Sequence, residues 1–405
     1  MTAVLPSSLP LTPRAPSAST AATPALPPIL YGYLGNGYEK GLGRQGGLTD
    51  ALAQLTTVIL LKRSPASPSS PKFRPTVQQL RENLLVVHNA FALRYSRLGR
   101  RIGKPAGLLD GRWLNTALAH AGIADYIYWL ADSSPAMLWG MPTHRLVYDC
   151  YDPCFIPQEQ PRVDKNEFAA ARLAKIVFAT AETLAARMRI VNPNVHLLPN
   201  ACSTDTLHAP PAQADLPQLR DRPRPVVGCM STYDWRFDAD IVYHTARLLP
   251  DITFALVGRI NADQQHRLQP LRSLPNVLLP GAVSYDDGLL WTSAFDIGLI
   301  PFLPGDISDA VNPVKMYMYL AAGKPVVSTH IHECTQNSFV RTARTPEQLA
   351  AAIRAAAADR TPESAARRIR FAANNRWQDR ASSAARILTA NGLAARRSAT
   401  DGFPA

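Results

Sequence analysis

The sequence predicts an α/β protein of two domains, each built on a largely parallel β-sheet. A length of 405 residues is sufficient for two domains that each bury a complete core. A Pro-rich stretch at 208–224, HAPPAQADLPQLRDRPR, is typical of a linker between them. The clearest secondary-structure pattern lies at 296–329, where a strand, a loop, a helix and a second strand follow one another.

This unit also contains the clearest candidate ligand site. Asp296–Phe302 is an apolar, β-branched run of the kind buried in parallel sheets, and Lys324–Thr329 resembles it. Between them, Pro313 suits the first turn of a helix that Asn312 caps. The helix would begin at the carboxyl edge of the sheet, where such sheets bind ligands. Lys315 falls in the first turn, and free N–H groups there favour a phosphate.

The remaining pattern alternates strands and helices on both sides of the linker. Before it we expect strands at 29–34, 57–61, 84–88, 126–130, 145–149, 175–179 and 195–199, with helices at 48–55, 113–122, 167–172 and 180–188. After it we expect strands at 225–230, 254–258 and 277–280, with helices at 238–249, 347–358 and 362–374. The predicted organisation is a disordered tail (1–27), a first domain (28–207), a linker (208–224), a second domain (225–376), a helix that crosses back onto the first domain (377–391) and a mobile tail (392–405).

Composition restricts the class of protein. The net charge of +12 favours an anionic partner, but no RNA- or DNA-binding motif accompanies it, so nucleic acid is not expected. The five cysteines form no C-x-x-C pair or disulfide framework, which indicates free thiols in a reducing compartment. No apolar run approaches the roughly 18–20 residues of a membrane span, and the amino terminus lacks a secretory apolar region. We therefore expect a cytoplasmic protein.

A basic segment at 91–107, FALRYSRLGRRIGKPAG, interleaves arginines and a lysine with apolar residues. Such a segment can lie on an anionic membrane surface, which would make the protein peripheral on the inner membrane. The alternative is a solvated surface helix. Both interpretations remain open from the sequence.

A glycine-rich loop after the first strand contains G-x-G-x-x-G at Gly41–Gly46. A dinucleotide site would require this pattern directly at the strand end and an acidic residue after the second strand. Residues intervene here, and Lys62 and Arg63 follow the second strand, so only NADP would fit. The alternatives are a loop that lines a cleft between the domains, through Gly35 and Gly43, and a purely structural turn.

Polar residues at two predicted strand ends are candidates to face a ligand in the cleft. Asp149 and Asp152 follow the strand at 145–149, and a carboxylate there can act as a general base or cap the next turn. His88 ends another strand, where it either hydrogen-bonds a ligand or is a satisfied core histidine. Neither H-E-x-x-H nor D-x-D occurs near a strand end, so no metal is expected.

Five stretches in order resemble the GT-B glycosyltransferases, in particular family-4-like enzymes of exopolysaccharide and teichuronic acid assembly. NPVKMYMYLAAGKPVV (312–327) is similar to their donor-site helix. The other stretches are LVYDCYDP (146–153), AKIVFATAETLAARM (174–188), NVHLLPNACSTDTL (194–207) and VVGCMSTYDWRFDADI (226–241). The resemblance implies the GT-B fold, two Rossmann-like domains facing a central cleft, and transfer of a sugar from a nucleotide diphosphate donor to a hydroxyl of a saccharide or lipid-linked saccharide. It implies no metal and no cofactor apart from the donor itself.

The resemblance also implies site residues. The donor-binding residues would be Gly228, Met230, Ser231, Arg259, Val283, Phe302, Asn312, Lys315, Met318 and Glu333, with the base of the nucleotide near Arg259 and Phe302. Lys315 would be catalytic, and so would Asp152, which resembles the inverting base of xanthan-type glucuronosyltransferases. The acceptor side would comprise Gly35, Gly43, His88 and Asp149.

One departure from the family pattern keeps a second hypothesis open. Retaining relatives carry two glutamates eight positions apart, where this chain has Ala310 and Met318. A thioether accepts hydrogen bonds far more weakly than the carboxylate that binds the ribose hydroxyls. The sequence thus allows an active enzyme, inverting or retaining, and a degenerate GT-B protein that only binds nucleotide-sugar or partners. An NADP-dependent oxidoreductase and a sugar-nucleotide epimerase are minor alternatives.

Overall fold

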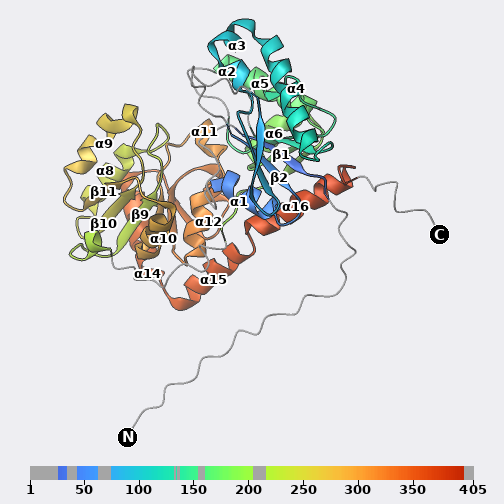
Figure 1. Cartoon of the computed structure of the whole chain (residues 1–405). Helices are drawn as coiled ribbons and strands as arrows, with labels where there is room; N and C mark the ends of the chain where they lie inside the picture. The colour runs from blue at the N-terminus through green and yellow to red at the C-terminus, as the bar shows by residue number, and fades with distance from the viewer. Residues whose placement is uncertain are drawn as a thin grey trace, which may run out of the picture.

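The computed structural model describes residues 26–33, 43–62, 74–131, 134, 137–153, 160–203 and 216–395. These residues form two α/β domains, each with its own sheet, that lie side by side (Figure 1). This architecture confirms the expected fold class. Residues 1–25 and 396–405 of the expected tails, Gly35, Gly41 and residues 208–215 of the linker lie outside the described residues. The inner ends of the two expected tails differ from that expectation, because Leu26 and Leu393 are buried in the amino-terminal core.

The amino-terminal sheet has the strand order β3-β4-β2-β1-β5-β6-β7-β8. Its neighbouring strands pair in parallel except β3, which runs antiparallel to β4 at the edge. The strands are β1 (Ile29–Gly32), β2 (Val58–Leu61), β3 (Thr76–Arg81), β4 (Leu84–His88), β5 (Ile127–Leu130), β6 (Leu146–Cys150), β7 (Ile176–Ala179) and β8 (Val195–Leu197). The helices are α1 (Gly43–Leu52), α2 (Ala92–Tyr95), α3 (Arg97–Ile102), α4 (Lys104–His120), α5 (Gln160–Leu173) and α6 (Glu182–Arg189).

The carboxyl-terminal sheet has the order β11-β10-β9-β12-β13-β14, with parallel pairing throughout. Its strands are β9 (Val226–Met230), β10 (Thr253–Val257), β11 (Val277–Gly281), β12 (Ile297–Ile300), β13 (Val326–Thr329) and β14 (Val340–Ala343). Its helices are α8 (Ala239–Leu248), α9 (Gln265–Arg272), α10 (Tyr285–Ala294), α11 (Asp306–Asp309), α12 (Val314–Ala321), α13 (His332–Thr335), α14 (Pro346–Ala358) and α15 (Pro362–Ala373), with short 3₁₀ turns at Pro217–Leu219 and Ala262–Gln264.

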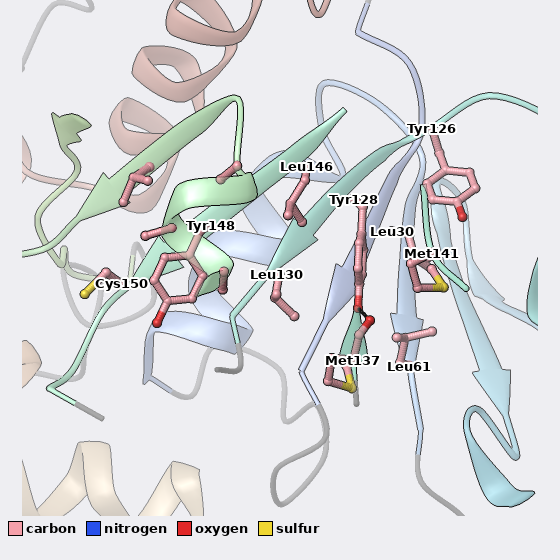
Figure 2. Close-up of a cluster of buried hydrophobic side chains, with 14 of the residues drawn as sticks. Leu30, Leu61, Tyr126, Tyr128, Leu130, Met137, Met141, Leu146, Tyr148 and Cys150 are labelled. Atoms are coloured by element: carbon pink, nitrogen blue, oxygen red, sulfur yellow. Dashed lines mark hydrogen bonds between the residues drawn. The ribbon is translucent and has the colours of Figure 1, made fainter. Parts of the chain in front are cut away.

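Alternation along the strands gives each sheet two apolar faces. In β5, Tyr128 and Leu130 face the cluster shown in Figure 2, whereas Ile127 and Trp129 face the opposite core. Helices cover both faces, which explains why these strands are apolar along their whole length. The strands β1, β2 and β5 are accordingly fully buried.

The last helix, α16 (Trp377–Ala390), leaves the carboxyl-terminal domain and packs beneath the amino-terminal sheet, against α1 (Figure 1). Its residues Trp377, Ala381 and Leu388 belong to the same apolar core as Leu48 of α1. Gly47 of α1 lies so close to the Trp377 indole that a Cβ there would sit 2.1 Å from Nε1. The amino-terminal core is therefore completed by residues from the far end of the chain.

Several predicted helix and strand boundaries differ from those in the structure. The helix α1 begins at Gly43 rather than Leu48, so it contains part of the glycine-rich run after β1. Within this helix, contact with Trp377 requires glycine at Gly47. An exposed edge strand, β3, lies between the expected strands at 57–61 and 84–88, where no strand was expected. Asn312 does not cap α12: the helix begins after Pro313, whose side chain makes no capping bond. The sequence analysis also did not anticipate α9 and β14.

Candidate functional site

A cavity of about 480 Å³ lies between the two domains. The amino-terminal domain contributes Gly43 and the segment Ala201–Ser203, and Trp377 comes from α16. The rest of the wall belongs to the carboxyl-terminal domain: Met230–Thr232, Val257–Arg259, Ala282–Tyr285, Gly288, Leu289, Val314, Lys315 and Met318. The lining residues of this cavity include Lys315 and Arg259 but no Asp or Glu among the described part of the chain. This charge balance favours an anionic ligand.

Lys315 lies in the first turn of α12, as the sequence predicted, and faces the cavity. Its Nζ donates a hydrogen bond to Ser231 Oγ at 2.9 Å and lies 4.5 Å from the centroid of the Phe302 ring. Burial lowers the pKa of Lys315 below its usual value, and nearby Arg236 adds to that effect. An anion bound beside it would favour the charged ammonium form.

Main-chain hydrogen bonds at the carboxyl ends of β9, β10 and β11 hold Ser231 beside Lys315. Ser231 N donates to Val257 O at 3.0 Å, and Gly258 N donates to Gly281 O at 2.8 Å. Gly258 has a φ of +139°, and a Cβ there would sit 1.7 Å from Ser231 O. Only glycine permits this close approach, so Gly258 is a site residue that the sequence analysis did not identify.

Gly228 has a different role from the one predicted. It lies within β9 rather than in a turn, and a Cβ on it would sit 2.0 Å from Phe295 Cγ. Gly228 is therefore needed for packing beneath the site and does not contact the cavity. Phe302 is also absent from the lining, since it is buried beneath Lys315 instead of facing a nucleotide base.

The other expected donor-side residues divide into two groups. Met230, Arg259, Val283 and Met318 line the cavity together with Lys315 and Ser231. Asn312 and Glu333 do not line it: Asn312 is buried, and its Nδ2 donates to Glu333 Oε2 at 2.7 Å. Burial is the main cause of a raised pKa at Glu333.

Asn312 instead connects the two domains. Its Oδ1 accepts a hydrogen bond from Asn200 N at 3.0 Å, and its carbonyl oxygen accepts one from Asn200 Nδ2 at 2.6 Å. Asn200 follows β8 in the amino-terminal domain, whereas Asn312 immediately precedes the α12 segment. The amino-terminal domain thus holds the chain just before Lys315.

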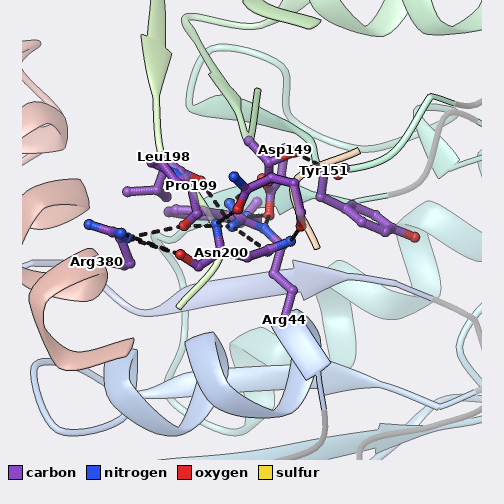
Figure 3. A network of polar contacts seen from close by, with 10 residues as sticks. Arg44, Asp149, Tyr151, Leu198, Pro199, Asn200 and Arg380 are labelled. Atoms are coloured by element: carbon purple, nitrogen blue, oxygen red, sulfur yellow. Dashed lines mark hydrogen bonds and ion pairs between the residues drawn. The ribbon is translucent and has the colours of Figure 1, made fainter. Parts of the chain in front are cut away.

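A buried arginine, which the sequence analysis missed, fixes Asn200 in turn. Arg44 donates from Nη1 to Leu198 O at 3.0 Å and to Asn200 Oδ1 at 3.3 Å (Figure 3). Its Nη2 and Nε bind the two oxygens of Asp149 at 2.7 and 3.0 Å. Arg380 of α16 joins the same cluster, with its Nε 3.2 Å from Pro199 O.

This cluster changes the interpretation of Asp149. Its carboxylate is buried, Arg44 binds both oxygens, and Trp129 Nε1 donates a third hydrogen bond at 3.1 Å. The geometry does not fit the expectation that Asp149 faces an acceptor. A charged residue within a glycine-rich loop, together with an acid at a strand end, was the signal that could have indicated this pair.

Asp152 is not among the residues that line this cavity, and its side chain is 42% exposed beside the other domain. Its carboxylate Oδ2 is 4.0 Å from Nη1 of Arg236, which belongs to the other domain. Burial raises the pKa of Asp152, while Arg236 and, less strongly, Arg44 oppose that change. The Arg236 guanidinium also lies 5.8 Å from the Phe302 ring that Lys315 covers, so Asp152 and Lys315 approach the same part of the cleft.

His88 and the glycine-rich loop lie apart from this arrangement. His88 ends β4, four strands from β6 in the sheet order, and its Nε2 shares a 2.8 Å hydrogen bond with Gln78 of the edge strand. Gly43 lines the cavity, but Gly35 lies outside the described residues. The four described residues of G-x-G-x-x-G, Gly43–Gly46, form the first turn of α1, where Arg44 turns inward to Asp149. No observation favours a dinucleotide there.

The described residues contain neither a metal-binding cluster nor a membrane-spanning helix. No group of three or more His, Cys, Asp or Glu side chains in this part of the chain could hold a metal ion. No helix within it combines the length and apolar character needed to cross a membrane.

Comparison with known proteins agrees with this geometry. Residues 224–359 match the family described as "Glycosyl transferases group 1". A Bacillus subtilis (strain 168) protein, TuaH, named as a teichuronic acid biosynthesis glycosyltransferase, is 30% identical over 137 residues, which cover 34% of each chain. That similarity therefore spans about a third of the length of the relative.

Solved structures extend the likeness to both domains. Sucrose-phosphate synthase from Thermosynechococcus elongatus matches with a TM-score of 0.69 and 16% identity, over 91% of this chain and 100% of that one. Anabaena HepE, solved with UDP and glucose, matches with a TM-score of 0.64 and 16% identity, over 90% and 99% of the two chains. The fold is thus that of the GT-B glycosyltransferases. Within it, residues 224–359 of the carboxyl-terminal domain match the family described as "Glycosyl transferases group 1", which confirms the resemblance seen in the sequence.

Proposed function

We propose that this protein transfers a sugar from a nucleotide diphosphate donor to a hydroxyl of a saccharide or lipid-linked saccharide in the synthesis of a bacterial surface polysaccharide. The observation that carries the proposal is the cavity between the domains, whose lining holds Lys315 and Arg259 and no carboxylate within the described residues. The family match over 224–359 includes every lining residue that the carboxyl-terminal domain contributes, whereas Trp377 of α16 lies beyond it. The name of TuaH supports the biological setting.

In the proposed reaction, the acceptor oxygen forms a bond to the anomeric carbon as the bond from that carbon to the diphosphate breaks. The carboxylate of Asp152 takes the proton of the acceptor hydroxyl as a general base. The electron pair of the broken bond leaves with the diphosphate. Lys315 and the N–H groups at the start of α12 offset the charge that develops there.

A second candidate function is binding without transfer. Met318 favours it, because this thioether lines the cavity at the position where the family pattern has a glutamate. One experiment separates the two. The protein is incubated with UDP-, GDP- and dTDP-sugars and a lipid-linked saccharide, and both the melting temperature and the released nucleoside diphosphate are measured. Release that depends on the acceptor and falls at least a hundredfold in Asp152→Asn supports transfer. A melting-temperature shift with no release supports the binding protein.

We also infer that the amino-terminal domain contacts an anionic membrane surface through α3 and the first turns of α4. Leu98, Ile102, Leu108 and Leu109 are 60, 44, 43 and 43% exposed. Arg97, Arg101 and Lys104 are exposed among them, whereas the one acid of this region, Asp110, is buried. Apolar side chains flanked by exposed cations fit a bilayer of anionic lipid.

Only the later part of the 91–107 segment is proposed to contact the membrane. Phe91 and Arg94, at the start of the 91–107 segment, are buried, and Arg94 Nε pairs with Asp110 at 3.2 Å. The first part of the segment therefore anchors α2 to α4. The surface proposed for the membrane consists of α3 and the beginning of α4, at the end of the domain remote from α16 (Figure 1).

Vesicle sedimentation tests this contact. The triple variant Arg97→Gln, Arg101→Gln and Lys104→Gln should bind phosphatidylglycerol vesicles about a hundredfold more weakly, since each basic residue contributes about 1 kcal/mol. A triple variant with the same charge change on the other domain, Arg247→Gln, Arg272→Gln and Arg354→Gln, is the control. Equal binding of both variants, or equal binding to neutral vesicles, would contradict the proposal.

A further inference from the structure

Arg236 is the cation that faces Asp152 across the cleft, and its own domain holds it firmly. It follows β9, and its carbonyl oxygen accepts a hydrogen bond from Leu303 N at 2.7 Å. Asp234 binds its side chain in a fork, with Oδ2 2.7 Å from Nη2 and 3.1 Å from Nε. Asp234 Oδ1 also accepts from Arg236 N at 2.9 Å. The position of the guanidinium is thus set before any partner from the other domain arrives.

The remaining nitrogen of this fork points to the other domain. Nη1 of Arg236 lies 4.0 Å from Oδ2 of Asp152, and the two side chains are 28% and 42% exposed. The charged groups that act on the Asp152 carboxylate include Arg236, Arg44 and Asp234. Arg44 already binds both oxygens of Asp149 and two acceptors near β8, so its charge is largely committed elsewhere.

We propose that Arg236 is a positioning residue for the base: it reaches across the cleft to orient the Asp152 carboxylate and to favour its ionised form. The proposal rests on the function proposed above. It adds that the base is fully assembled only when the two domains are apposed, because the carboxylate and its cation come from different domains. Transfer to water would be limited in the open form, in which Asp152 lacks this partner.

The balance of charges gives the direction of the effect. Burial raises the pKa of Asp152, and Arg236 is the first of the groups that lower it. A general base acts when deprotonated, so the rate falls as the pH drops through the pKa of Asp152. Removal of the Arg236 charge should therefore move the acidic limb of the pH–rate profile to higher pH, by about one pH unit for a partly exposed pair.

The experiment measures kcat and kcat/KM between pH 5 and 9 for the full chain, once a donor and an acceptor are known from the assay above. Arg236→Gln should shift the acidic limb upward by about one unit, with about tenfold lower kcat/KM below that limb and near recovery above it. Arg236→Lys keeps the charge and should shift it less. Arg354→Gln, which removes an exposed arginine paired with Asp251 on the same domain, should leave the profile unchanged.

The outcomes separate this inference from the function on which it rests. If Asp152→Asn turns over at nearly the wild-type rate, the assignment of the base is wrong. If Asp152→Asn is inactive but Arg236→Gln has the wild-type pH profile, the base stands and the role of Arg236 is refuted. If Arg236→Gln lowers kcat equally at every pH, Arg236 does not act through Asp152. Thermal melting of each variant verifies that the protein is folded.

Discussion

Replacement of Lys315 by methionine separates the binding role of this residue from its role in folding. The methionine retains the apolar stem over Phe302 but removes the ammonium that donates to Ser231 Oγ at 2.9 Å. If that ammonium offsets charge on the leaving diphosphate, its loss should lower kcat by about 10²–10³, or about 3–4 kcal/mol. The same change should abolish most of the thermal stabilisation by a nucleoside diphosphate.

Without ligand, by contrast, Lys315→Met should not lower the stability of the protein at neutral pH. Burial lowers the pKa of Lys315, so the folded chain binds this proton less tightly than the unfolded chain does. Stability from this group is therefore reduced at neutral pH and recovers as the pH rises from the lowered pKa towards about 10.4. Lys315→Met lacks this cost. Without ligand it should melt no lower than the wild type at pH 7, within the roughly 1 kcal/mol of one lost hydrogen bond.

A matched control lies in the same domain. Lys324 is also partly buried with a lowered pKa, but its Nζ donates to Ser293 O at 2.7 Å and it is not part of the cavity wall. Lys324→Met should behave like Lys315→Met in melting experiments without ligand and like the wild type in turnover. Turnover by Lys315→Met within threefold of the wild-type rate would refute the site. So would an undiminished melting shift with UDP, GDP or dTDP.

Two other substitutions test the same geometry. Met318→Glu places a carboxylate on the cavity wall and should tighten nucleoside diphosphate binding by one to two orders of magnitude in calorimetry, since a charged hydrogen bond contributes about 1.5–3 kcal/mol; unchanged or weaker binding would show that the ribose lies elsewhere. Arg44→Met leaves Asp149 buried without its cation and should lower the free energy of unfolding in urea by about 3–5 kcal/mol, while Arg44→Met with Asp149→Leu should recover part of that loss. Equal destabilisation by the single and double variants would contradict this account of the pair.

The fold and the donor side were accessible from the sequence because their signals are local. Strands such as β12 and β13 are short apolar runs, and the turn that carries Lys315 lies between them within 34 residues. The resemblance also placed Met318 with Lys315 among the donor-binding residues, and both line the cavity. Where a single helix or strand determines the position of a residue, propensity and periodicity were sufficient to predict that position.

Residues whose roles depend on distant partners were missed or misread. Arg44 and Asp149 are 105 positions apart, and Arg236 meets Asp152 only because two separate domains are apposed. Asn312 has the sequence context of a helix cap, but its side-chain oxygen accepts a hydrogen bond from the main-chain N–H of Asn200 instead. No local pattern encodes such pairings, because they arise only after both domains have folded.

The position of α16 bears on the order in which this chain acquires its structure during synthesis. The amino-terminal sheet emerges from the ribosome first, yet the helix that seals one of its apolar faces includes Trp377 and Leu388, nearly 200 residues after β8. Until then that face is open to solvent or to chaperones. A fragment ending at the linker should consequently aggregate, and a protease cut at the linker should leave two pieces that stay together.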